Sequence, residues 1–347
     1  MRQYGANAVV EARESHELRE AWSADSGSYV TAVGVSRNGG LLAVGTGAGE
    51  VIVFDVRSGA ICSRVFGHAG GVLSLDWSPL GVLATAGQSG HVHLYDTRSD
   101  QLAIISGTTA WVDQVIWAPD GKRLATAAGR VVSVWTATGT LTWKTGAHEG
   151  PVSGLAWNRQ GTEFVTACQG GIQFFRLSPD PKTRRFPSPG SLISLAWSPS
   201  GSVLACGTQE RSVRFWRLPT GHESEISGFS SKPRALAWDA AGSLLATGGD
   251  RTVNVWAFDG NGPEGSAPTP LFGHDSLCTA LAFHPSEPRL ASGGDDLQVL
   301  LWAPRETALP VARGFLKETV TGLAWALGGQ RLIGVDALGT VRAWCVD

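Results

Sequence analysis

The sequence is low in charge and contains no long apolar run. Only 17% of its 347 residues are charged, and the formal net charge is −2. Neither value suits a disordered tail or a nucleic-acid-binding groove. No stretch of about 18 apolar residues occurs, so no membrane-spanning helix is expected. The segment Met1–Glu17 also lacks the apolar stretch of a secretory signal. We therefore expect neither nucleic acid nor a membrane as a partner.

Cysteine is also scarce. The cysteines are scattered, odd in number and without a C-x-x-C pair; they are Cys62, Cys168, Cys206, Cys278 and Cys345. This usage is typical of a reducing compartment, where cysteine serves as a small core residue. The sequence therefore predicts a cytoplasmic protein.

Motifs of catalysis and of metal binding are missing as well. The sequence has no G-x-S-x-G, no H-E-x-x-H and no phosphate-binding P-loop. The run GTGAGE at Gly45–Glu50 looks like a dinucleotide loop, but no helix follows it. His91 and His93 could reach one metal ion across a strand, yet no third ligand is near in sequence. We expect no catalytic residue, no metal site and no cofactor.

Glycine and tryptophan, in contrast, are abundant, with 45 and 14 residues, and a repeat of about 40 residues runs through the chain. Eight units start at Val30, Val72, Val112, Val152, Leu192, Pro233, Cys278 and Val320. Five residues into each unit stands a bulky residue: Val35, Trp77, Trp117, Trp157, Trp197, Trp238, Phe283 and Trp325. A second aromatic residue comes later in each unit: Phe54, Tyr95, Trp135, Phe175, Trp216, Trp256, Trp302 and Trp344. Agreement at both positions in every unit establishes the repeat.

Each unit is predicted to contain short strands separated by turns. In the unit that starts at Val72 the first three are VLSLDW, LATAG and VHLY. The third strand of each unit alternates apolar and mostly polar residues, which is the period of a β-strand. A fourth, less regular strand fills the rest of the unit. Four antiparallel strands per repeat are the pattern of a β-propeller blade.

The first strands indicate why such blades should close into a ring. Their fourth position is always Val or Leu, whereas the third and fifth positions are mostly Ala or Gly. One face of the strand is therefore large and the other small, and stacked blades can insert large faces into small ones. A single blade cannot bury both of its faces, so the ring is expected to close.

The repeat resembles the WD-repeat (WD40) family over about residues 30–347. The marks are Gly67-His68 and Gly273-His274 before a unit, AWSP at Ala196–Pro199, and the endings Phe54-Asp55 and Tyr95-Asp96. The resemblance implies a structural hydrogen-bond network of His, Ser or Thr, Asp and Trp. Only one unit keeps all four residues, as His274, Ser292, Asp296 and Trp302. Apolar packing between blades is therefore expected to be the main source of stability.

Eight units imply eight four-stranded antiparallel blades in an all-β fold. The last unit stops at Asp347, directly after its third strand, so its outer strand must come from elsewhere. The segment Glu17–Trp22 fits by its distance from Val30 and would remove an open edge. We expect a single domain, with residues 1–29 as tail and ring-closing strand and residues 30–347 as the propeller. The alternative is seven blades plus one aberrant unit.

One rim of this ring is the candidate binding surface. The turns leading into the first strands and the turns between second and third strands meet there; we call it rim A and the opposite rim, rim B. Tyr29 and Trp111 stand where other units have Gly, Pro or Ser, and an aromatic residue beside Arg is typical of interface hot spots. The candidate partner-binding residues are Tyr29, Trp111, Arg130, Glu210, Arg211, Lys232 and Arg251. In the alternative interpretation, Trp111 merely covers the adjacent blade.

Two segments depart from the repeat. Residues 178–190 replace an outer strand with a Pro-rich stretch, in which Lys182, Arg184 and Arg185 either meet an acidic partner or form a solvated edge. Residues 259–270 are expected to be a long flexible loop between a third and a fourth strand.

The favoured interpretation is a non-catalytic scaffold that binds a protein or peptide on one rim, as a monomeric ring within a larger complex. Blades stacked around a ring move little, so their loops are pre-organised for docking, and the resemblance implies the same role. The alternative is an enzyme or ligand-binding propeller with its site at the mouth of the central channel. Polar residues of the first strands would build that site: Asp76, Asp113, Gln114 and Arg234.

Overall fold

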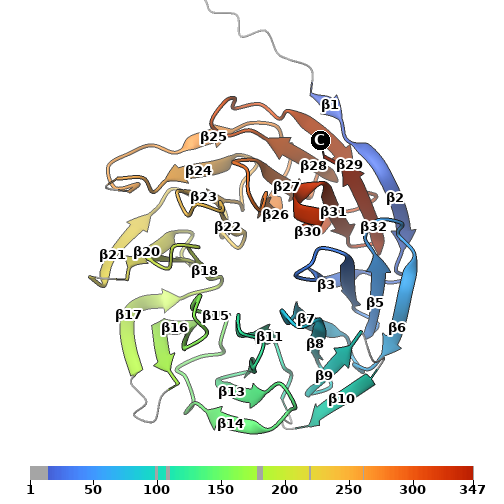
Figure 1. The fold of residues 1–347 in the computed structure, drawn as a ribbon. Coiled ribbons are helices and arrows are strands. Elements are labelled where there is room, and N and C mark those ends of the chain that lie inside the picture. Colours follow the sequence, from blue (N-terminus) through green and yellow to red (C-terminus); the bar gives the residue numbers. More distant parts are fainter. Residues whose placement is uncertain are drawn as a thin grey trace, which may run out of the picture.

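The molecule is the predicted eight-bladed β-propeller. The computed structural model describes residues 15–97, 101–106, 110–177, 183–218, 220–260 and 262–346. Within these ranges the only helical segment is a 3-10 turn, η1 (Leu327–Gly329), so no helix there is long enough to cross a membrane. Eight β-sheets follow one another in chain order around a common axis (Figure 1). Eight blades are therefore confirmed, and the seven-blade alternative is wrong.

Blades 1 to 3 each contain four strands, whereas blade 4 contains three. Blade 1 contains β3 (Val30–Val35), β4 (Leu41–Thr46), β5 (Glu50–Asp55) and β6 (Ile61–Phe66). Blade 2 contains β7 (Val72–Trp77), β8 (Val82–Gly87), β9 (His91–Asp96) and β10 (Gln101–Ser106). Blade 3 contains β11 (Gln114–Trp117), β12 (Arg123–Ala128), β13 (Val131–Thr136) and β14 (Leu141–Lys144). Blade 4 contains β15 (Gly154–Trp157), β16 (Glu163–Arg176) and β17 (Thr183–Ser191).

The remaining blades complete the ring. Blade 5 contains β18 (Ala196–Trp197), β19 (Val203–Gly207), β20 (Val213–Arg217) and β21 (His222–Ile226). Blade 6 contains β22 (Leu236–Trp238), β23 (Leu244–Thr247), β24 (Val253–Ala257) and β25 (Thr269–Leu271). Blade 7 contains β26 (Cys278–Phe283), β27 (Leu290–Gly294), β28 (Gln298–Trp302) and β29 (Ala312–Phe315). Blade 8 contains β30 (Val320–Ala326), β31 (Arg331–Asp336), β32 (Thr340–Cys345) and, from the other end of the chain, β2 (Arg19–Asp25).

The Pro-rich segment forms a strand instead of replacing one. The long strand β16 holds both the second and the third strand of blade 4, because it doubles back at Gly170 and Gly171, which have φ of 84° and 121°. Residues 183–191 then pair with its second half as the outer strand β17. Proline is tolerated at such an edge because no further strand needs its missing N–H. Lys182 lies outside the described residues.

The two arginines of this strand already have partners within the chain. Arg185 pairs with the carboxylate of Glu149, and Arg184 lies over the ring of Phe174, with its guanidinium carbon 4.4 Å from the ring centroid. Exposed ion pairs of this kind contribute little to stability. The geometry favours the solvated-edge interpretation over an acidic partner at this place.

The loop at residues 259–270 is more constrained than expected. It joins β24 to β25, but Glu264 in its middle accepts hydrogen bonds from Arg217 at 2.9 Å and from Ser224 at 3.0 Å, both in blade 5. The loop therefore crosses to the neighbouring blade and is tied down there. The sequence prediction of a free loop missed this contact because the partners lie 40 or more residues away.

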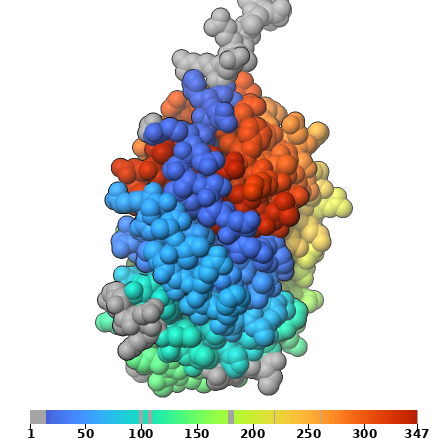
Figure 2. Space-filling model, turned by 90° about the vertical axis from the view of Figure 1, so that its right-hand side faces the viewer, coloured from blue at the N-terminus to red at the C-terminus, as the bar shows by residue number. Residues whose placement is uncertain are grey.

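The N-terminal segment closes the ring by pairing with the C-terminal strand. β2 lies antiparallel to β32, and before it β1 (His16–Glu17) pairs in parallel with β29 of blade 7. Figure 1 and Figure 2 show this blue segment lying along the red blades. The expected strand, Glu17–Trp22, is thus in the right place but starts two residues later and extends to Asp25. The division into residues 1–29 and 30–347 stays a prediction, and residues 1–14 lie outside the described residues.

The core consists of eight apolar clusters, one at each junction between neighbouring blades. At the closing junction, for example, Ile52 and Phe54 of blade 1 pack with Ile333 and Val335 of blade 8, and all four are fully buried. Among the residues that the structure describes, no apolar cluster lies within a single blade. The expected packing of large faces against small ones therefore holds the ring together, and every blade depends on both of its neighbours.

Hydrogen bonds between first strands reinforce four of these junctions. The indole N–H of four first-strand tryptophans donates to a carbonyl on the first strand of the preceding blade, at 3.0–3.2 Å. The pairs are Trp77 with Gly34, Trp157 with Ile116, Trp238 with Ala196, and Trp325 with Ala282. The repeated bulky residue thus fills the junction and also links the two blades. These links join neighbouring blades near the rim B ends of their first strands.

Candidate functional site

Rim A forms as expected, because its two sets of turns are hydrogen-bonded to each other. In blade 1 the amide of Gly47 donates to the carbonyl of Tyr29 at 3.0 Å. In blade 7 the amide of Asp295 donates to the carbonyl of Leu277 at 2.9 Å. Turns that are distant within a unit therefore lie side by side on one rim, and their side chains are presented by a fixed backbone.

The predicted site residues do not form one patch. Tyr29 is in blade 1, where its ring lies against Gly47 and is 53% exposed. Trp111 leads into blade 3 and is 56% exposed. Because Trp111 is exposed to this extent, the interpretation that it covers the adjacent blade is weakened. The remaining candidates lie on other blades.

Arg130 is already bound within the ring. Its Nε donates to the carbonyl of His148 at 2.5 Å, and its own carbonyl lies 2.9 Å from Nδ1 of the same histidine. His148 in turn contacts Thr166 through Nε2 at 3.0 Å. Arg130 therefore links blade 3 to blade 4, which leaves less of it available for a partner than the sequence suggested.

Two of the candidates, Arg211 and Lys232, do come together, around a recess between blades 5, 6 and 7. Its volume is about 530 Å³, and we call it the blade 5–7 hollow. Its walls are formed by Arg211, Ser230, Ser231, Lys232, Arg234, Ala235, Gly249, Leu277, Cys278 and Thr279. A second recess of about 430 Å³ adjoins it, shares Ser230 and Leu277, and includes Arg251. Sequence reasoning named Arg211, Lys232 and Arg251 but did not recognise that they face neighbouring recesses.

The charge of the hollow is not balanced by the chain. Lys232 and Arg234 are exposed, and neither has an ion pair among the residues that the structure describes. Arg211 donates only to the carbonyl of Ser230, at 3.2 Å. Asp250 and Asp275 line the adjoining recess, and Asp250 accepts hydrogen bonds from both the amide and the hydroxyl of Ser230. Its carboxylate is therefore engaged in a local turn and does not pair with these cations.

Glu210 lies apart from the hollow. Its carboxylate is beside Gly190, at the end of the outer strand of blade 4. It is exposed, and it carries a charge opposite to that of Arg211 next to it in the chain. Glu210 therefore sits at the edge of the basic region instead of within it.

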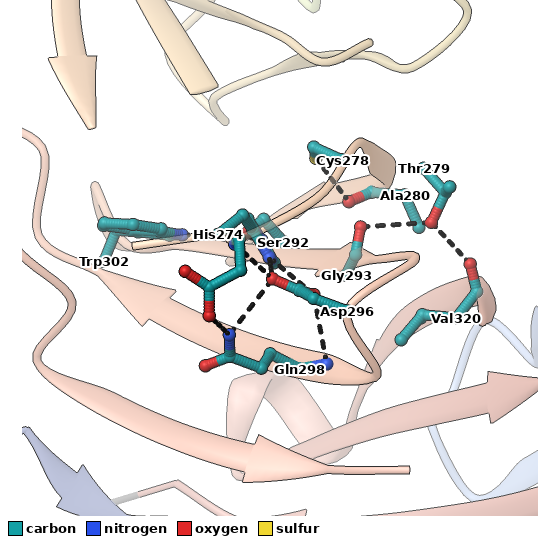
Figure 3. A network of polar contacts seen from close by, with 11 residues as sticks. His274, Cys278, Thr279, Ala280, Ser292, Gly293, Asp296, Gln298, Trp302 and Val320 are labelled. Atoms are coloured by element: carbon teal, nitrogen blue, oxygen red, sulfur yellow. Dashed lines mark hydrogen bonds and ion pairs between the residues drawn. The ribbon is translucent and has the colours of Figure 1, made fainter. Parts of the chain in front are cut away.

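The structural network of blade 7 has the geometry that the resemblance implied (Figure 3). His274 lies 2.9 Å from Asp296 through Nδ1 and 2.7 Å from Ser292 through Nε2, and Trp302 donates to the same serine at 2.7 Å. Burial opposes ionisation of Asp296, but the hydrogen bond from His274 and those from backbone amides lower its pKa. The network fixes the turn that carries Leu277 into the hollow.

Other blades keep parts of this network and replace the rest. In blade 2, His68 contacts Thr85 at 2.9 Å and Ser89, in place of an aspartate, at 3.1 Å. In blade 6 the histidine position is Phe229, and Asp250 binds Ser230 instead. The missing histidine of blade 6 thus coincides with the place where the hollow opens.

The histidines of blade 2 form a buried stack. His93 lies against His68 with ring centroids 4.3 Å apart. Burial, followed by the charges of His93 and His91, lowers the pKa of His68 to about 4, and burial lowers that of His93 as well. Among the described residues no group of three or more His, Cys, Asp and Glu side chains is placed to hold a metal ion. The geometry is that of a structural cluster.

The residues considered for a channel-mouth site serve as links between strands. Asp76 accepts the amides of Trp77 at 2.9 Å and of Trp117, in the next blade, at 2.7 Å. Burial nevertheless raises its pKa to about 6. Burial also raises the pKa of Asp113, which accepts the amide of Gly129 at 3.3 Å.

Gln114 and Arg234 belong to different places. Gln114 donates to the carbonyl of Val152 at 3.4 Å, and Arg234 faces the blade 5–7 hollow. Within the described residues, no two of the four channel-mouth candidates share a hydrogen bond. Each of the four is engaged by backbone groups or lies at another site.

Sequence comparison identifies relatives with the same repeats. More than half of the chain matches the family described as WD domain, G-beta repeat, at residues 60–96, 99–136, 181–217, 219–257 and 266–303. WD repeat-containing protein slp1 of Schizosaccharomyces pombe is 24% identical over 301 residues, covering 81% of this chain and 53% of that protein. Cell division cycle 20.1, cofactor of APC complex, of Arabidopsis thaliana is 28% identical over 273 residues, covering 71% and 52%. The chain thus spans about half the length of these curated relatives.

A solved structure supports the fold. The crystal structure of the computationally designed Ika8 protein superposes with a TM-score of 0.79 and 21% identity, covering 96% of this chain and all of that one. At this identity the likeness concerns the fold alone. With the eight blades, the repeat pattern and the family match taken together, the chain belongs to the WD domain, G-beta repeat (WD40) family.

Proposed function

We propose that this protein is a non-catalytic scaffold that binds a partner protein or peptide on rim A. The observation that carries the proposal is that exposed aromatic and cationic side chains stand on this rim without use inside the ring. Trp111 makes no aromatic or cation–π contact, and Lys232 and Arg234 have no ion pair, among the residues that the structure describes. Exposed aromatic and cationic side chains on a fixed backbone are what protein interfaces use as anchors.

The rigidity of the ring supports this role. Eight shared apolar clusters hold the blades together, and backbone hydrogen bonds join the two sets of turns that form rim A. Binding to pre-organised loops loses less conformational entropy than binding to mobile ones. A partner can therefore be held by a modest number of contacts.

The relatives support a role in assembling proteins. One of them is named a cofactor of the APC complex, so the name places a similar propeller inside a larger protein assembly. We propose the same kind of role here, with this chain as a monomeric ring within a complex and without nucleic acid as a partner. A cytoplasmic location is consistent with the cysteines, all five of which are free thiols.

The proposal is tested by comparing variants on the two rims. Trp111→Ala with Lys232→Ala removes an aromatic residue and a cation from rim A. Leu80→Ala with Arg159→Ala makes matched changes at exposed positions in the rim B turns. The full chains serve as bait in cells of the native organism, and bound proteins are quantified by mass spectrometry.

The rim A variant is expected to lose its partners while the rim B variant keeps them. Both variants should melt within a few degrees of the parent protein, because none of the four side chains fills the core. Equal recovery of the same partners by both variants would show that rim A is not the binding surface.

A further inference from the structure

The blade 5–7 hollow has the charge of a site for acidic groups. The chain as a whole carries a formal net charge of −2, yet three cations and no carboxylate line this recess. Two of the cations, Lys232 and Arg234, lie two residues apart in the turn that leads into blade 6, and Arg211 reaches them from blade 5. Like charges held close together repel one another, so an anion placed among them is favoured.

The backbone of Arg211 is left-handed in the turn between the second and third strands of blade 5. This residue has φ of 62°, in the left-handed region. At the same position of the turn, blades 1, 2 and 8 have Gly49, Gly90 and Gly339, with φ between 76° and 99°. A residue other than glycine costs about 1 kcal/mol there. Blade 7 has Leu297 at the equivalent position, with φ of 67°, so the turn accepts a side chain there, and in blade 5 that side chain adds a cation to the hollow.

The hollow also has an apolar side. Leu277 is 40% exposed at its margin, and Ala235 and Cys278 form part of its wall. The carbonyl of Leu277 accepts the amide of Asp295 at 2.9 Å, so the backbone that carries this leucine is fixed. An apolar side chain next to an acidic one can therefore be buried in the same recess.

We propose that the blade 5–7 hollow binds a short acidic peptide segment of a partner protein. Aspartate or glutamate side chains of the segment pair with Lys232, Arg234 and Arg211, and a neighbouring aliphatic side chain packs on Leu277. The volume of about 530 Å³ suits a few side chains and falls within the range of roughly 300–1,000 Å³ of small binding sites. This inference rests on the proposed function and names the chemistry of the partner.

A phage-displayed library of random heptapeptides tests the proposal without knowledge of the partner. The full chain should enrich peptides in which Asp or Glu stands beside Leu, Ile or Val. The variant Lys232→Glu with Arg234→Glu should no longer enrich them, whereas Arg159→Glu, an exposed arginine of rim B, should enrich the same peptides as the parent. Failure to enrich acidic peptides, or equal enrichment by the reversed variant, would overturn the proposal.

The strongest selected peptide then gives a quantitative test by fluorescence anisotropy. We expect the charge-reversed variant to bind this peptide at least about tenfold more weakly than the parent. Binding by the parent should weaken as salt is raised from about 50 mM to about 500 mM, because the paired charges are partly exposed. An oligonucleotide of the same net charge should not compete; competition at equal concentration would mean an unspecific anion site and would also overturn the proposal.

Two further variants separate this proposal from folding and from the general function. Lys232→Gln with Arg234→Gln removes charge without creating repulsion, and Arg211→Gly introduces the glycine that other blades have. Both variants should fold, and both should bind the peptide less tightly than the parent protein does. If partners are captured through Trp111 while these variants bind acidic peptides as the parent does, the peptide proposal fails and the scaffold function stands.

Discussion

Trp22 offers the sharpest test of how the ring is closed. It lies on β2, which belongs to blade 8, but its ring stacks on Phe54 of blade 1 with centroids 6.0 Å apart. Its indole N–H donates to the carbonyl of Val56, also in blade 1, at 2.8 Å. This one side chain therefore joins blade 8 to blade 1, where the ring closes. Trp22→Ala should weaken the junction on which closure depends.

The expected loss of stability can be worked out from these contacts. Replacing a fully buried tryptophan by alanine costs roughly 3–5 kcal/mol, and Trp22 is only partly buried, so its apolar contacts are worth about 2 kcal/mol. The hydrogen bond to Val56 adds about 1 kcal/mol. We expect the free energy of unfolding to fall by about 3 kcal/mol, measured by urea denaturation followed by tryptophan fluorescence and circular dichroism.

Trp111→Ala is the matched control. The same residue type is removed, but Trp111 is 56% exposed on rim A, so the change should stay within about 0.5 kcal/mol. If Trp22→Ala were no more destabilising than Trp111→Ala, the N-terminal strand would not close the ring in the way described here.

Three further predictions follow from the same contacts. Stability should decrease as pH falls from about 6.5 towards 4, because His68 is protonated in the unfolded chain but stays neutral in the fold, where its pKa is about 4; the loss is about 3 kcal/mol. The urea midpoint of the parent should therefore fall more between pH 7 and pH 4.5 than that of His68→Gln, and an equal fall in both proteins would contradict a buried neutral imidazole. Deletion of residues 1–24 should expose the edge of β32 and cause aggregation in light scattering; a monomeric truncated protein with unchanged melting temperature would disprove the closure. Arg211→Gly should leave the melting temperature unchanged or raise it slightly, since the left-handed turn then carries its preferred residue, and a drop of several degrees in calorimetry would mean that Arg211 is needed for folding.

The blades could be predicted from the sequence because each repeat must bury two faces at fixed spacing. The bulky residue five positions after each unit start lies at a blade junction. The alternation of apolar and polar residues along each third strand places them on opposite faces of the blade. The closing strand could be predicted from the missing outer strand after Trp344, but its limits could not. Its register depends on how Trp22 reaches Phe54 across the junction, a contact that no local pattern shows.

The candidate site could be predicted only in part. Rim A follows from the order of the strands, and Arg211, Lys232 and Arg251 were recognised as departures from the repeat. Their grouping around recesses depends on the curvature of the ring, which brings together turns from three blades. One signal was present in the sequence: alignment of the units places Arg211 where Gly49 and Gly339 stand. The engagement of Arg130 with His148 had no such signal, because its partner atom is a backbone carbonyl.

Site-specific photo-crosslinking tests the central claim most directly. A benzophenone-bearing phenylalanine is placed at Leu277 on rim A or at Leu80 in the rim B turn between β7 and β8; both side chains are exposed, at 40% and 55%. After irradiation in cells of the native organism, we expect covalent adducts with partner proteins from position 277 and none from position 80. The adducts from position 277 should be lost when Lys232→Glu and Arg234→Glu are added. Adducts from position 80 alone, or the same adducts from both positions, would contradict it.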